Sequence, residues 1–174
     1  EYINSHYVIM ATKKGQVKKT SLEKYSRPRV NGVAAITIKE DDELLEAKLT
    51  TGDSQVMLAL KSGKAIRFEE AKTRPMGRTA SGVRAITLKD DKDEVIGMVA
   101  VNDLNCDILV VSEKGYGKRS SLEDYRITNR GGKGVKTLNI SEKTGNLVAI
   151  KNVDDKNDLM IINKSGLTIR MAVE

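Results

Sequence analysis

The sequence predicts an all-β, propeller-like fold of four-stranded blades, forming a partial ring of about three blades and the start of a fourth. Three observations predict it. A glycine turn followed by a basic residue recurs at regular intervals, each repeat contains four short apolar runs, and a second glycine precedes the third run. Repeats of about 50 residues with four short strands each are typical of propeller blades.

The repeat is defined by its turn glycines, which are Gly15, Gly63, Gly115 and Gly166. The residue four positions after each of them is basic: Lys19, Arg67, Arg119 and Arg170. The second glycine of the first three repeats is Gly32, Gly82 or Gly134. We therefore divide the chain, taken as one partial domain over residues 1–174, into repeats at about 6–54, 55–105, 106–157 and 158–174.

The apolar runs give the expected strands in order. In the first repeat they cover residues 7–11, 16–20, 33–38 and 44–49. In the second they cover 56–60, 65–68, 83–88 and 95–101, and in the third 108–111, 117–120, 135–140 and 147–150. The first run is apolar throughout, as in a strand covered on both faces. The third alternates apolar and polar residues, as in a half-exposed strand. The glycine turn between the first two runs predicts a hairpin.

One local preference conflicts with the repeat. Residues 40–49 favour a helix by propensity. Their equivalents, residues 94–101 and 146–153, are poor helix formers and good strands. Because repeats with the same anchors should share a fold, we predict a strand.

The ring predicted from these repeats is incomplete. Closed propellers have about four to eight blades, so three blades and the start of a fourth cannot close a ring. We expect the chain to be a piece of a longer protein that holds the other blades, or an open arc with exposed ends.

Composition narrows the class of protein. The chain of 174 residues is long enough for one core of ordinary size, and its net charge of +6 favours a polyanionic partner. The single cysteine, Cys106, cannot form an internal disulfide, which fits a reducing compartment. No apolar stretch is long enough for a membrane helix, so we expect no membrane partner and, with the free cysteine, a cytoplasmic location.

The basic residues concentrate in the first half of each repeat. Residues 13–29 carry a net charge of +6, residues 61–84 and 114–136 carry +5 each, and the remainder carries −10. One such run is usually a solvated face, but three in the same phase predict a continuous basic band. The band fits the phosphate backbone of duplex DNA. With one Phe, five Tyr and no Trp, a stacking platform for single strands is not expected, and nothing resembles a recognition helix.

Three groups of residues are predicted to contact that backbone. The first is the basic position after each turn glycine, although these side chains could instead bridge to acidic turns of the next blade. The second lies on loops between the second and third runs, where glycine lets a phosphate approach or simply closes the blade: Arg27, Arg29, Arg74, Arg78, Arg126, Arg130, Gly131, Gly132 and Lys133. The third comprises Lys13, Lys14, Lys18, Lys64, Arg84, Lys118 and Lys136.

No catalytic, metal or cofactor site is predicted in this chain. The loop at residues 130–134 lacks P-loop spacing, and His6 is the only histidine. The acidic turns at 40–43 and 90–94 lack calcium-loop spacing and are interpreted as solvated connectors. Two rival functions remain: a propeller-type interaction module that binds an acidic protein, and an enzyme fragment with a site at the centre of the ring. The apolar first runs count against the second.

Four stretches together carry a resemblance to a known family: Met76–Val83, Glu113–Arg119, Tyr125–Val135 and Asp158–Arg170. In them the chain resembles the C-terminal domains of DNA gyrase A and, more distantly, of topoisomerase IV. The box that defines the gyrase family, Gln-Arg-Arg-Gly-Gly-Lys-Gly, is matched in its last five positions by Arg130–Gly134, whereas Thr128 and Asn129 depart from it. We interpret this as a box-like loop of a later blade, with the true box upstream.

The resemblance implies a six-bladed β-pinwheel, a propeller-like ring in which neighbouring blades exchange strands. It implies that duplex DNA is bound, bent and wrapped around the basic outer edge. The domain would then present DNA to a type IIA topoisomerase core for supercoiling, with gyrase B and the rest of gyrase A as partners. The active sites, with their ATP and Mg²⁺, would lie in other parts of that enzyme.

Overall fold

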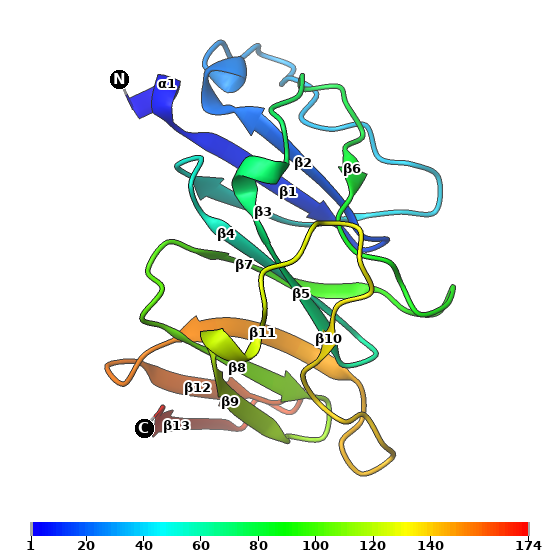
Figure 1. Cartoon of the computed structure of the whole chain (residues 1–174), viewed down its shortest axis with the longest axis vertical. Coiled ribbons are helices and arrows are strands. Elements are labelled where there is room, and N and C mark those ends of the chain that lie inside the picture. Colours follow the sequence, from blue (N-terminus) through cyan, green and yellow to red (C-terminus); the bar gives the residue numbers. More distant parts are fainter. Residues whose placement is uncertain (1, 174) are drawn as a thin grey trace.

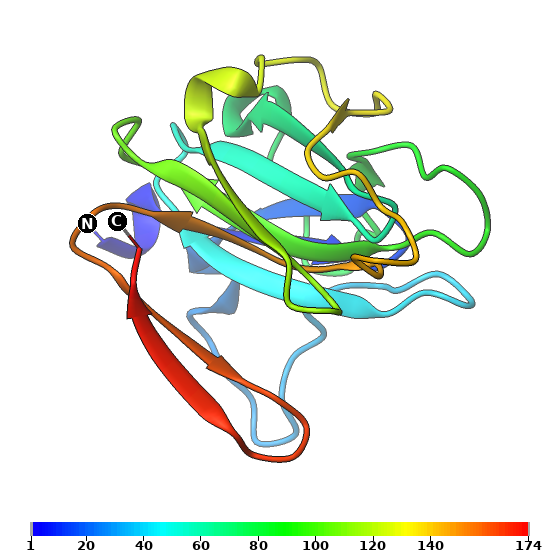
Figure 2. The ribbon, with the colours of Figure 1, turned by 90° about the horizontal axis from the view of Figure 1, so that it is seen from below.

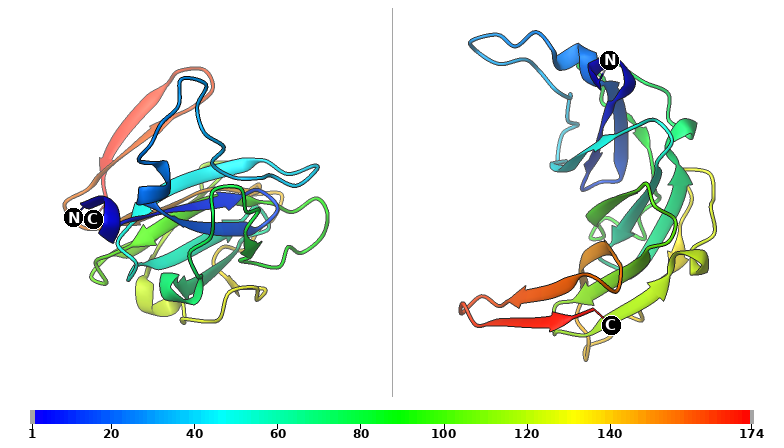
Figure 3. Two further views of the ribbon diagram at one scale, coloured as in Figure 1. Left: turned by 90° about the horizontal axis from the view of Figure 1, so that it is seen from above. Right: turned by 90° about the vertical axis from the view of Figure 1, so that its left-hand side faces the viewer.

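The chain folds into a row of small antiparallel sheets with few helices. The computed structural model describes residues 2–173. Figure 1 shows the sheets following one another along the long axis, and the right-hand view of Figure 3 shows that they form an arc. The predicted all-β fold is confirmed.

The elements in chain order are α1 (Tyr2–Ser5), β1 (Tyr7–Thr12), β2 (Gln16–Ser21), the 3₁₀ turn η1 (Leu22–Tyr25), β3 (Leu44–Thr50), β4 (Gln55–Leu60), β5 (Lys64–Glu69), η2 (Glu70–Lys72), β6 (Val83–Arg84), β7 (Val95–Val101), β8 (Asp107–Ser112), β9 (Gly117–Ser121), η3 (Leu122–Asp124), β10 (Val135–Lys136), β11 (Leu147–Val153), β12 (Asp158–Ile162) and β13 (Thr168–Ala172).

Each blade is built around a hairpin closed by a turn glycine. Gly63 has a φ of +87°, in the left-handed region that favours glycine. A Cβ at this position would also collide with the carbonyl oxygen of Leu138 in the next repeat. The glycine therefore serves the turn and the close approach of the following repeat.

Neighbouring repeats exchange strands. The first sheet has the order β3-β1-β2-β6 and the second β10-β5-β4-β7, so β6 and β10 each complete the sheet of the preceding repeat. Val83 pairs with Val17, and Val135 pairs with Ala65. The third sheet, β11-β8-β9, has three strands, and the fourth repeat forms the pair β12-β13. The exchange that the resemblance implied is confirmed.

The third run of each repeat forms less strand than predicted. Residues 33–38 form none, and the runs at 83–88 and 135–140 contribute only two residues each. After these two residues the chain bends around the preceding hairpin, where the amides of Ala85 and Thr137 donate to the carbonyls of Gly15 and Gly63 at 2.8 and 2.9 Å. Ala85 and Ile86 are buried there. The alternation of apolar and polar residues in the third run therefore reflects packing against the hairpin turn of the preceding repeat, not a half-exposed strand. Residues 33–38 pair with none of the described strands.

The stretch whose helical propensity conflicted with the repeat forms β3 from Leu44 onward, which confirms the strand prediction. Residues 40–43 before it form the turn. Pairing with β1 over the whole length of β3 overrides the local preference.

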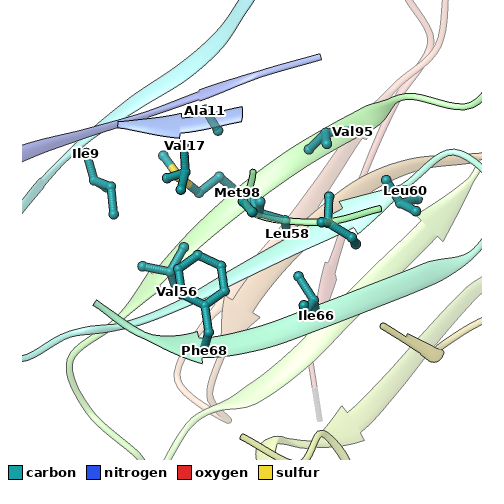
Figure 4. Packing of buried hydrophobic residues seen from close by; sticks show 12 residues of the cluster. Ile9, Ala11, Val17, Val56, Leu58, Leu60, Ile66, Phe68, Val95 and Met98 are labelled. Carbon is teal, nitrogen blue, oxygen red and sulfur yellow. The ribbon is translucent and has the colours of Figure 1, made fainter. Parts of the chain in front are cut away.

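The core lies between the blades. Val56, Leu58 and Leu60 on β4 pack with residues of β1, β2, β5 and β7 in one cluster (Figure 4), whereas Met57 and Ala59 point into a second cluster shared with the third repeat. All five are fully buried, which is why β4 has an apolar side chain at every position from Val56 to Leu60. The β12–β13 hairpin projects from the body of the arc together with the loop after η1 (Figure 2), and many of its apolar side chains are exposed.

Candidate nucleic-acid interface

The candidate interface is the outer edge of the blades, which we define as β2, β5, β9, the exchanged strands β6 and β10, and the loops at 73–82 and 125–134. Figure 3 places η2, η3 and the 125–134 loop on the convex side of the arc. The loop after η1, which carries Arg27 and Arg29, projects to the opposite side with the β12–β13 hairpin that carries Arg170. These three predicted contacts are therefore not brought to the outer edge.

The exchanged strands place two basic residues at equivalent points of the outer edge. Arg84 on β6 and Lys136 on β10 are both exposed. Lys136 is the direct partner of Lys64 across the β5–β10 pairing, whereas Arg84 pairs with Gln16. Like charges directly opposite each other are unfavourable unless an anion lies nearby. The edge therefore has positive charge that the fold does not neutralise.

The loops add further exposed cations. Arg74 follows η2 and Arg126 follows η3, so they occupy the same place in successive repeats. Both are exposed, as is Lys133 in the glycine loop. None of the three forms an ion pair with a residue between 2 and 173. Their charges remain available to a partner.

The glycine loop at residues 130–134 is fastened to the preceding repeat. The amide of Gly131 donates to Ala85 O at 2.6 Å, and the amide of Thr87 donates to Gly132 O at 2.8 Å. Gly134 has a φ of +74°, and a Cβ there would collide with the Ala65 carbonyl. A Cβ at Gly132 would make only ordinary contacts, and Gly132 is exposed. Gly134 is thus required by the fold, and Gly132 is the glycine that a phosphate can approach.

The basic position after the turn glycine braces the blades instead of facing outward. Lys19 is 4% exposed and its ammonium lies 3.4 Å from the carboxylate of Glu70 in the second repeat. Arg67 is 5% exposed and donates to the carbonyls of Leu122 and Tyr125 at 3.0 and 2.8 Å. The prediction that these two lie on the DNA-facing edge is wrong, because both side chains are buried at the seams between repeats.

The same position is partly exposed in the later repeats but still engaged. The guanidinium of Arg119 binds Asp107 at 2.8 Å and Asp155 at 2.6 Å, and donates to Val173 O. Hydrogen bonds from Asp155 and Asp107 raise the pKa of Arg119 above its usual range. Arg170 is exposed and pairs with Asp158 in its own hairpin. Lys19, Arg67 and Arg119 all contact the following repeat, but only Lys19 reaches an acidic side chain there, as the alternative for this position required.

Lys18 is also buried, contrary to its predicted role in DNA contact. It is 1% exposed, and its ammonium donates to the carbonyls of Ala35 and Arg78. Burial, followed by the charge of Arg78, lowers the pKa of Lys18. Lys18 stands where the second repeat has the core residue Ile66, and ties the loops of the first two repeats together.

Most of the remaining residues predicted to contact DNA form an ion pair or a hydrogen bond within the fold. Lys13 pairs with Glu43 at 2.6 Å, which raises the pKa of Lys13. Arg78 donates to Ala34 O at 3.3 Å and Arg130 to Arg84 O at 3.1 Å. Lys14 is exposed and donates to Asp91 O at 3.3 Å, and Lys118 on β9 is exposed.

The acidic turns are more than solvated connectors. The buried carboxylate of Asp93 accepts hydrogen bonds from the amide and hydroxyl of Ser62, at 3.1 and 2.7 Å. In the first repeat Asp42 accepts from the Lys14 amide at 2.9 Å. Each aspartate thus fastens the hairpin turn to the segment that leads into the last strand of the same blade, β3 or β7.

Three lysines near the outer edge were not among the predicted contacts: Lys61, Lys89 and Lys92. They lie beside Lys64 and Lys136 around one hollow. The signal in the sequence was the insertion of lysines into the otherwise acidic turn at 89–94. Within residues 2–173, no group of three or more His, Cys, Asp or Glu side chains could hold a metal ion, and no helix is long and apolar enough to cross a membrane.

Blades that exchange strands along an arc, with basic side chains at equivalent points of one edge, define a propeller-type domain of the pinwheel kind. The model of a family described as "DNA gyrase C-terminal domain, beta-propeller" matches residues 6–51, 56–102 and 107–154. The chain belongs to this family of DNA gyrase C-terminal domains.

Relatives and solved structures agree with this assignment. DNA gyrase A of Staphylococcus epidermidis is 46% identical over 168 residues, covering 96% of this chain and 19% of that protein. The Staphylococcus aureus protein is 45% identical over 169 residues, with 97% and 19% covered. The chain thus spans about a fifth of the length of these relatives.

Two solved domains share the fold. The C-terminal domain of DNA topoisomerase IV superposes with a TM-score of 0.92 at 22% identity, over 99% of this chain and 54% of that one. A DNA gyrase A C-terminal domain gives 0.85 at 23% identity, over 99% and 57%. At these identities the likeness concerns the fold alone.

Proposed function

We propose that this domain binds the backbone of duplex DNA along its outer edge, without sequence preference, and bends and wraps it. The observation that carries the proposal is the recurrence of exposed, unpaired cations at equivalent points of successive repeats. Arg84 and Lys136 recur on the exchanged strands, and Arg74 and Arg126 on the loops. On a curved row of blades, these points follow a curved path.

Phosphate contacts are the expected chemistry along this path. Backbone contacts position a protein on DNA without carrying sequence information, which suits an edge of lysines, arginines and glycine loops. Bending a site by 40–90° costs about 1–6 kcal/mol in elastic estimates. Several charge-assisted contacts along the edge offset this cost.

In the parent enzyme, the domain would present wrapped DNA to a type IIA topoisomerase core for supercoiling. This part of the proposal rests on family membership and on the relatives, which are gyrase A proteins. Gyrase B and the rest of gyrase A would be its protein partners. The active sites, ATP and Mg²⁺ would belong to other domains, and the enzyme would act in the cytoplasm on the nucleoid.

A gel-shift titration on linear duplex DNA at two salt concentrations tests binding. Affinity should fall steeply as salt rises. In a plot of the logarithm of the binding constant against the logarithm of the salt concentration, each neutralised phosphate should contribute about −0.9 to the slope. Sealing a nicked plasmid in the presence of the domain tests wrapping, since a fixed hand of wrapping shifts the linking number in one direction. Binding to an acidic polypeptide with no binding to DNA would instead favour the protein-interaction module.

A further inference from the structure

A hollow of about 620 Å³ lies at the seam between the second and third repeats. Three segments line it: the tip of the β4–β5 hairpin, the turn at residues 89–93, and the chain from β10 to the start of β11. In Figure 1 the hairpin tip lies beside β10. Residues far apart in the sequence therefore form one concave surface.

Backbone hydrogen bonds fix the walls of this hollow. The carbonyl of Gly63 accepts from the amides of Thr137 and Leu138 at 2.9 and 3.3 Å. The amide of Leu147 donates to Lys61 O at 3.1 Å. Because these bonds join two repeats through the main chain, the hollow is formed before any ligand enters.

Five lysines and two aspartates line the hollow: Lys61, Lys64, Lys89, Lys92, Lys136, Asp90 and Asp93. The carboxylate of Asp93 is already occupied, because it accepts from both donors of Ser62 and from the amides of Lys89 and Glu94 at 3.1 and 3.0 Å. Asp90 accepts from the amide of Lys92 at 2.9 Å. None of the five lysines forms an ion pair with any residue that the structure describes.

Comparison with the first repeat shows that Lys61 lacks an ion pair that its equivalent there forms. Lys13 and Glu43 there occupy the positions of Lys61 and Glu94, and they form an ion pair at 2.6 Å. In the second repeat, Lys61 and Glu94 meet only through the main chain, with the amide of Lys61 donating to Glu94 O at 2.8 Å. The second repeat thus leaves a lysine charge that the first repeat neutralises.

We propose that this hollow binds backbone phosphates of duplex DNA and leads a strand from the outer edge onto the face formed by the hairpin tips. Lys64 and Lys136 belong to both surfaces, so the path is continuous. Ammonium groups are compact charges on flexible stems and accept a phosphate in many orientations, which suits binding without sequence preference. The inference rests on the proposed function, which it extends beyond the outer edge to Lys61, Lys89 and Lys92.

The test compares two double variants that remove the same charge. Lys89→Gln with Lys92→Gln changes two exposed lysines of the hollow. Lys39→Gln with Lys156→Gln is the matched control, because Lys39 holds the position of Lys89 in the first repeat and both are exposed outside the hollow. The hollow variant should lower the log–log salt slope of duplex binding by up to about 1.8, for two lost phosphate contacts. The control should retain the full slope.

Further measurements separate the ways in which the idea can fail. Equal salt slopes for the two double variants would overturn DNA binding in the hollow. In that case, weaker duplex binding by an Arg84→Gln, Lys133→Gln variant would still support DNA binding at the outer edge. No duplex binding by the unsubstituted domain would overturn both proposals. Titration with inorganic tripolyphosphate distinguishes a free polyphosphate ligand. If the hollow variant lost tripolyphosphate but bound DNA as before, DNA would be the wrong ligand.

Discussion

The ammonium of Lys19 lies 3.4 Å from the carboxylate of Glu70, and both side chains are buried at the seam between the first and second repeats. The same carboxylate accepts hydrogen bonds from the hydroxyl of Thr50 and, at 3.1 Å, from the amide of Ser54. The ammonium also lies 4.3 Å from the centre of the Tyr7 ring. This contact joins two blades through polar groups that water does not reach.

The first prediction concerns this buried pair. Glu70→Gln leaves the charge of Lys19 buried without a counter-ion, so we expect a loss of about 3–5 kcal/mol in the free energy of unfolding. Denaturant titration followed by circular dichroism measures it. Glu69→Gln is the matched control, since Glu69 is the exposed neighbour. Equal effects of the two changes would show that the pair does not brace the seam.

The second prediction separates a brace from a DNA contact. Arg67→Gln removes donors to two buried carbonyls of the third repeat and should cost about 1–3 kcal/mol of stability for each carbonyl left unpaired. It should leave the salt slope of DNA binding unchanged. Arg84→Gln should preserve stability and lower that slope by about 0.9. A reversal of these two outcomes would place the DNA contact at Arg67.

The third prediction uses the lowered pKa of Lys18. The folded chain releases this proton at lower pH than the unfolded chain, whose lysine titrates near 10.5. The unfolded state then binds more protons in the window just below pH 10.5, so Lys18 makes stability rise with pH there. Lys18→Met should flatten that rise, as measured by unfolding at a series of alkaline pH values. Lys24→Met, which changes an exposed lysine, should leave the rise intact.

The hairpins were predictable because their determinants are local. A turn glycine followed by an apolar run fixes the β4–β5 hairpin at Gly63, and the repeat correctly predicted a strand where the local propensity favoured a helix, at β3. The apolar first run also indicated that β4 would be covered on both faces, as the two core clusters on either side of it show.

The rest depends on contacts between repeats, which periodicity does not encode. The run at residues 83–88 shortens to β6 because its partner lies in the preceding repeat and its remaining residues wrap around that hairpin. Lys18 and Arg67 carry the same charge as exposed cations such as Lys14 and Arg74, so their burial became evident only from the carbonyls facing them. For the same reason, the repeat located a basic edge without showing which cations lie on it.

The last prediction distinguishes the two roles of glycine in the loop at residues 130–134. Gly134→Ala combines an unfavourable φ of +74° with a collision against the Ala65 carbonyl, so it should destabilise the domain by about 1–3 kcal/mol. Gly132→Ala places a methyl group 3.6 Å from Ile66 Cδ1, an ordinary contact, and should leave stability nearly unchanged. If a phosphate approaches the main chain at this exposed glycine, the added methyl should weaken binding to all duplex sequences by a similar factor. Thermal unfolding and gel shifts on two unrelated duplexes measure both effects. Unchanged affinity of a stable Gly132→Ala domain would confine DNA contact in this loop to the cations beside it.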